Sequence, residues 1–250
     1  MAVINLNESL SELKEYLPLN MRNSYFEIMF ENLLLVEETE FYNNAVINLT
    51  HFYNFVLHCF LIQVYYSEEN RVLLKYLQKT TGSLNSRDNG KIINLEESFD
   101  LNIFCNVEKD SIKYFFHILG FSENFHLCQK NQAIFDLRNS AAHLNMDIIN
   151  KNRFVDFINK IQYNFDSILK KTYKYTKDLI LKELKEAIKE DRIDEFLYPQ
   201  IFEEINPIYC VSLKFYKLFF KYNRFQNVQN NSPLYYMQKY LQEVLNLEHE

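Results

Sequence analysis

Glycine is nearly absent from this chain, which holds only 3 glycines and 4 prolines among 250 residues. Hairpin turns and the loops of mixed α/β folds depend on these two residues, because they supply backbone conformations that other residues disfavour. Long helices joined by few connections need neither residue. The sequence therefore predicts an all-α protein.

The same scarcity excludes several classes of enzyme. Gly82, Gly90 and Gly120 stand alone, so the chain cannot build a glycine-rich phosphate loop, a dinucleotide fingerprint or a nucleophile elbow. Aromatic residues make up 16% of the chain, which gives ample apolar area for a core. The 4 cysteines share no metal-ligand spacing, so we interpret them as reduced thiols and expect no metal and no cofactor.

Charge and targeting signals indicate a cytoplasmic protein. The first residues lack a basic region followed by a long apolar run, and the apolar run Phe55–Tyr66 is too short to span a bilayer. We therefore expect no contact with a membrane. The formal net charge of −6 argues against attraction of the whole molecule to nucleic acid, although it allows a local basic groove.

Helix-starting and helix-ending residues divide the chain into three segments. Residues 1–22 should hold one short helix, which starts at the capping-box pattern Ser9–Glu12 and is stopped by Pro18. Residues 23–192 should form a helical bundle. Residues 193–250, which include the other three prolines, should form a C-terminal helical extension.

Apolar periodicity predicts the helices of the bundle. A helix starts at Asn23 or Ser24, and a long central helix covers about Glu40 to Tyr66. Ser122 opens another helix, and Asn131–His143 forms a further helix or the continuation of that one. Asn150 starts a further helix whose period continues toward Arg192. The other expected elements are helices over Ser67–Gln78, Asp110–Gly120, Ile208–Asn223 and Pro233–Leu247, and an irregular stretch over Ser83–Asn106.

One short segment combines residues that suit phosphate chemistry. In Asp136–His143, Arg138 and His143 lie five positions apart and Asn139 directly follows the arginine. Five residues span about 1.4 helical turns, so the two side chains lie on adjacent faces. Arginine offers a planar cationic fork to phosphate oxygens, and histidine exchanges a proton near neutral pH.

The pattern Arg-Asn-x-x-x-His resembles the signature of the HEPN superfamily, the higher eukaryote and prokaryote nucleotide-binding domain. That family's motif pairs an arginine with a histidine a few residues later, often with Asn after the arginine. Its fold is a compact helical bundle in which the motif lies just before a long helix, and the match covers Phe26 to about Lys171. The resemblance implies a HEPN-like bundle with a C-terminal helical extension.

The resemblance also implies a metal-independent endoribonuclease that cleaves single-stranded RNA, with Arg138, Asn139 and His143 as catalytic residues. His143 would transfer a proton, Arg138 would stabilise the charged phosphorane, and Asn139 would orient the histidine or hold a phosphate oxygen. Active members are mostly homodimers with a composite site, and they include toxins, abortive-infection proteins and RNase modules of CRISPR effectors. We therefore expect a homodimer, a role in anti-phage defence, and an antitoxin or another defence-system partner.

Two basic stretches are candidates for RNA contacts, because interleaved cations and aromatic rings are typical of single-stranded RNA binding. The predicted RNA-binding residues are Lys170, Lys171, Lys174, Lys214, Lys217 and Lys221. The last three have near-helical spacing among aromatic residues. An ordinary amphipathic helix whose rings face the core also accounts for that spacing.

Two alternatives to a ribonuclease stay open. The first is a non-catalytic HEPN-type module that binds a nucleotide or a protein. The second is a plain helical scaffold, in which Arg138 lies on a solvated face and His143 near a helix end. His51 and His58 share a face of the long helix, but their aromatic neighbours favour structural histidines over a metal site.

Overall fold

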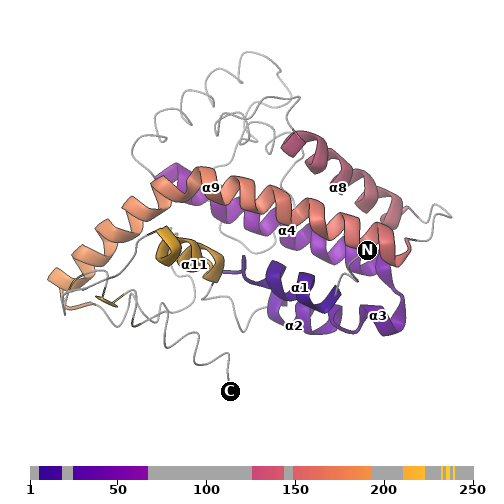
Figure 1. The fold of residues 1–250 in the computed structure, drawn as a ribbon, viewed down its shortest axis with the longest axis horizontal. Coiled ribbons are helices and arrows are strands. Elements are labelled where there is room, and N and C mark those ends of the chain that lie inside the picture. The colour runs from indigo at the N-terminus through magenta and orange to yellow at the C-terminus, as the bar shows by residue number, and fades with distance from the viewer. Residues whose placement is uncertain are drawn as a thin grey trace, which may run out of the picture.

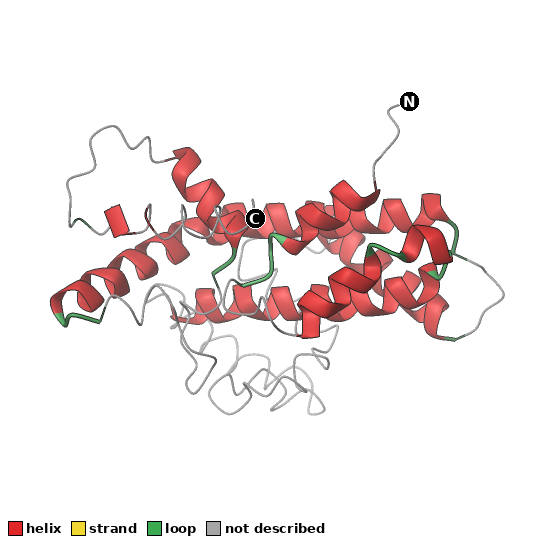
Figure 2. Cartoon of the chain, turned by 90° about the horizontal axis from the view of Figure 1, so that it is seen from below, coloured by secondary structure: helices red, strands yellow, loops and turns green. Residues whose placement is uncertain are grey.

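The computed structural model describes residues 6–18, 25–66, 126–143, 149–192 and 211–222, with Ser232, Tyr235, Tyr236 and Lys239. Most of these residues are helical and none of them belongs to a strand (Figure 2). The β-type pairing among these residues is an isolated bridge between Pro18 and Ser212. The all-α prediction is therefore confirmed. In the same part of the chain, no helix is long and apolar enough to cross a membrane.

Three helices form the centre of the molecule: α4 (Tyr42–Tyr66), α8 (His126–Ala142) and α9 (Lys151–Lys189) (Figure 1). Helices α4 and α9 run parallel. The Asn164 amide donates to the Tyr53 hydroxyl at 2.8 Å, and the Thr176 hydroxyl donates to Gln63 Oε1 at 3.1 Å. These two pairs join residues 111 and 113 positions apart, so the register of the two helices is nearly constant where they pack.

A chain of buried hydrogen bonds joins all three central helices at one point. The Tyr53 hydroxyl accepts from Asn164 of α9 and donates to Asn131 Oδ1 of α8 at 2.9 Å. Tyr53 and Asn164 are fully buried, and Asn131 is 4% exposed. Leaving a buried polar group without its partner costs about 1–3 kcal/mol, so these bonds favour one register of the three helices over any shifted one.

Helix α8 runs antiparallel to its two neighbours. Asn131, near its N-terminal end, bonds to Tyr53 in the middle of α4, and Ile149, shortly after its C-terminal end, donates its backbone N–H to Asn43 Oδ1 at 3.2 Å. Asn43 lies in the first turn of α4, and Ile149 lies two residues before the start of α9. The C-terminal end of α8 therefore lies beside the N-terminal ends of α4 and α9. We call this the motif end of the bundle.

The other helices among the described residues are α1 (Leu6–Lys14), α2 (Tyr25–Leu33), α3 (Val36–Thr39) and α11 (Leu213–Tyr222). Helix α1 packs on α9, where Gln162 Nε2 donates to the Glu12 carboxylate at 3.0 Å. Helix α11 reaches the end of α1 through the Lys214 N–H, which donates to the Glu15 carbonyl at 3.0 Å. Buried residues of all three predicted segments, such as Leu10, Phe165 and Phe215, belong to one continuous core.

Three predicted helix starts differ from the structure, and one of them is that of α11, which begins at Leu213 rather than Ile208. Helix α1 begins at Leu6, so Ser9 lies inside the helix, because the buried apolar period already starts at Leu6. The long central helix begins at Tyr42 rather than Glu40. Glu40 has a φ of 54° and ends the short helix α3, and this left-handed conformation separates the two helices.

The predicted start of the last bundle helix is confirmed. Asn150 is the N-cap of α9, where its side chain accepts from the Arg153 N–H at 3.0 Å. The helix then continues unbroken to Lys189. Other predicted elements lie outside the described residues: the helices over Ser67–Gln78 and Asp110–Gly120, the stretch Ser83–Asn106, and most of Pro233–Leu247.

Removing the Tyr53 hydroxyl should destabilise the fold. Tyr53→Phe leaves Asn131 Oδ1 and Asn164 Nδ2 buried without this partner, and we expect a decrease of about 1–3 kcal/mol in the free energy of unfolding, measured by urea denaturation. Tyr25→Phe is the matched control, because Tyr25 is 61% exposed. Equal stabilities of the two variants would contradict the role assigned to Tyr53.

Candidate functional site

The predicted catalytic residues lie at the C-terminal end of α8. The helical hydrogen-bond pattern continues to His143, whose backbone N–H donates to the Asn139 carbonyl at 3.1 Å. Arg138 Nη1 donates to Asn139 Oδ1 at 3.3 Å. Arg138 is half-buried, whereas Asn139 and His143 are exposed. The structure therefore brings the arginine and the asparagine together at the surface of the motif end.

Arg138 and His143 occupy different faces of α8. Five helical residues turn the chain so that the two directions differ by about 140°. Arg138 shares the inward face with the buried residues Ile134 and Ala141, and its guanidinium donates to Asn139 rather than to His143. A site that uses both side chains on one phosphate therefore needs a second copy of the motif or an RNA strand that bends around the helix end.

His51 of α4 is a neighbour of Arg138 that the sequence did not reveal. Partial burial, and then the positive charge of Arg138, lower the pKa of the His51 imidazole below its ordinary value. Its surroundings therefore favour the neutral form of the ring. The sequence places His51 and His58 on one face of the same helix. It contains no local signal that α8 packs beside His51.

A groove of about 290 Å³ lies between α8 and α9. Its polar lining consists of Asp136, Ser140, Arg153, Asp156 and Lys160. Gln132 Nε2 donates to Asp136 at 2.6 Å, and Lys160 pairs with Asp156. The groove therefore carries side chains of both charges.

The groove lies on the His143 side of α8. Asp136, Ser140 and His143 are spaced by four and three residues, so they share one flank of the helix. Arg138 lies on the other flank. The groove was not predicted, because it forms only when α8 and α9 pack against each other.

The six predicted RNA-binding lysines lie in two places. Lys170 and Lys171 are exposed on α9, and the side chain of Lys174 is outside the described residues. Lys214 and Lys217 both pair with Glu15 next to α1, the former at 3.8 Å.

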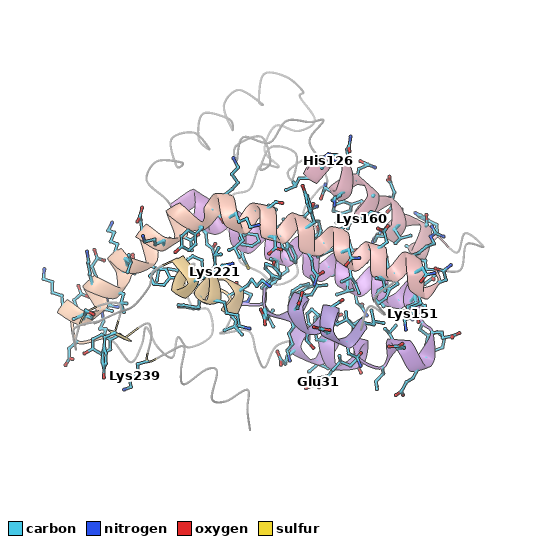
Figure 3. The ribbon with its side chains drawn as sticks, viewed as in Figure 1. Glu31, His126, Lys151, Lys160, Lys221 and Lys239 are labelled. Carbon is cyan, nitrogen blue, oxygen red and sulfur yellow. The ribbon has the colours of Figure 1, made fainter. Side chains whose placement is uncertain are left out.

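Lys221 is exposed on α11, well away from α8 (Figure 3). The rings of Phe215, Tyr216 and Phe219 are buried in the core, so they offer no stacking surface to RNA bases. The amphipathic-helix interpretation accounts for these rings. RNA contact by the lysines of α11 stays a prediction.

Comparisons with known proteins find no match: no family model fits the chain, and no curated protein or solved structure matches it. Among the described residues, no group of three His, Cys, Asp or Glu side chains is arranged to hold a metal ion. The candidate site therefore rests on the residues at the end of α8 and their neighbours.

The lowered pKa of His51 gives a pH-dependent stability. The unfolded chain, in which histidine has a pKa of about 6.5, binds the proton more readily than the folded chain, so the fold becomes less stable as the pH falls below that value. We therefore expect a fall in pH from about 8 to about 5.5 to lower the free energy of unfolding of wild type more than that of His51→Gln.

Urea denaturation across this pH range measures the difference. Arg138→Gln should reduce the pH dependence, because the Arg138 charge is the second cause of the pKa shift. A difference that stays constant with pH, or that moves in favour of wild type on acidification, would contradict the assignment.

Proposed function

We propose that this protein is a HEPN-type, metal-independent endoribonuclease that cleaves single-stranded RNA. The observation that carries the proposal is the place of Arg138, Asn139 and His143 at the end of α8, directly before the 39-residue helix α9. The exposed imidazole of His143 is open to a strand from solvent. The Arg138–Asn139 hydrogen bond orients both side chains at the same end of the helix.

The proposed reaction uses the 2′-hydroxyl of the RNA as the nucleophile. This oxygen attacks the adjacent phosphorus, a base removes its proton, and an acid protonates the leaving 5′-oxygen. His143 transfers a proton, and the Arg138 guanidinium stabilises the charge of the phosphorane. The products carry a 2′,3′-cyclic phosphate and a 5′-hydroxyl.

A homodimer would supply two histidines and two arginines to this reaction. The motif end has exposed apolar side chains that suit an interface between copies, namely Leu34, Leu35 and Phe41, which are 42%, 51% and 68% exposed. These residues flank α3. The ion pair between Glu37 of α3 and Lys151 joins this helix to the start of α9. A role in cytoplasmic anti-phage defence, with an antitoxin or similar partner, follows from the family resemblance alone.

Replacing His143 should abolish most of the activity. His143→Ala should lower the rate of cleavage of single-stranded RNA by about 10²–10⁴-fold, the usual contribution of general acid–base catalysis. The assay is run in EDTA. His126→Ala is the matched control, because His126 is exposed at the other end of the same helix (Figure 3).

The outcomes separate the three interpretations. Equal cleavage by wild type and His143→Ala would overturn the assignment of this residue. Binding of RNA or a nucleotide by wild type without cleavage would favour the non-catalytic module, and neither binding nor cleavage would favour the scaffold. Circular dichroism shows whether each variant keeps its helices.

A further inference from the structure

We propose that the groove between α8 and α9 holds one nucleotide of a single-stranded RNA, with its phosphate at Arg153 and its base toward Lys160. This inference rests on the proposed function, because it gives the RNA strand a path beside His143. The groove is a different surface from the lysine stretches that the sequence indicated.

The size and lining of the groove fit one nucleotide. Its volume of about 290 Å³ is at the lower end of the range of small-ligand pockets. Leu137 contributes half-buried apolar lining, against which a base can pack, and Phe157 lies buried beneath the groove. The carboxylates of Asp136 and Asp156 can accept hydrogen bonds from amino groups of a base.

The two ends of the groove differ in their relation to the motif. Arg153 lies in the first turn of α9, where the helix dipole favours negative charge, and it lines the groove together with Ser140, three residues before His143. Lys160 lies farther along α9, toward the middle of α8 (Figure 3). A phosphate near Arg153 would therefore be the one closest to His143.

The balance of charges makes the groove different from a general polyanion surface. Arg153 and Lys160 bring two positive charges, and Asp136 and Asp156 bring two negative ones. Binding there depends on local contacts rather than on a strong net field. This agrees with a chain whose formal net charge is −6.

The test measures RNA binding apart from cleavage. A fluorescein-labelled single-stranded RNA with 2′-O-methyl groups cannot be cleaved through its 2′-oxygen, and fluorescence anisotropy gives its Kd at several salt concentrations. In Arg153→Gln/Lys160→Gln, Kd should rise about tenfold or more. The slope of log Kd against log salt should fall by about 0.7 for each phosphate that the variant no longer neutralises.

Two further variants distinguish the groove from general charge effects. Ala133→Leu fills part of the groove without changing its charge, so it should raise Kd and leave the salt slope unchanged. Lys185→Gln/Lys189→Gln removes two exposed charges at the far end of α9 and should change neither quantity.

Wild-type Kd and salt slope in the Arg153→Gln/Lys160→Gln variant, or no RNA binding by wild type, would overturn the inference. Cleavage of unmodified RNA is measured in parallel. Normal cleavage and KM in that variant would contradict the groove proposal and would still support the ribonuclease proposal. RNA binding that depends on the groove, without cleavage by wild type, would support the groove proposal and contradict the ribonuclease proposal.

Discussion

The Tyr53 hydroxyl makes the hydrogen bonds on which the arrangement of the central helices depends. It bridges Asn131 and Asn164 within the core, so α4, α8 and α9 have one preferred register. That register places the end of α8 beside the starts of α4 and α9. The positions of Arg138 near His51, and of the groove beside His143, follow from it.

Local patterns predicted the helices but not their partners. The scarcity of glycine predicted the all-α class, and Asn150 marked the start of α9 because an N-cap is a local signal. The hydrogen bond from Tyr53 to Asn131 joins residues 78 positions apart, and the ion pair of Lys217 with Glu15 joins residues 202 positions apart. Such pairings have no local signature, so the His51 neighbourhood and the groove could not be predicted.

The two flanks of α8 carry different residues of the proposed site. One flank holds Arg138 near His51 of α4, and the other presents His143 beside the groove. A chain without glycine-rich loops has no cradle of backbone N–H groups for a phosphate, so side chains must supply the contacts. In the proposed ribonuclease, this division would require a second copy, or a strand bent around the helix end, to bring both side chains to one phosphate.

The chemical ends of the RNA products test the central proposal most directly. Wild-type protein is incubated in EDTA with a single-stranded RNA of defined sequence, and the fragments are identified by mass spectrometry. We predict 2′,3′-cyclic phosphate ends on the upstream fragments and 5′-hydroxyl ends on the downstream fragments. Intact RNA, or fragments with 3′-hydroxyl and 5′-phosphate ends, would contradict the proposed ribonuclease.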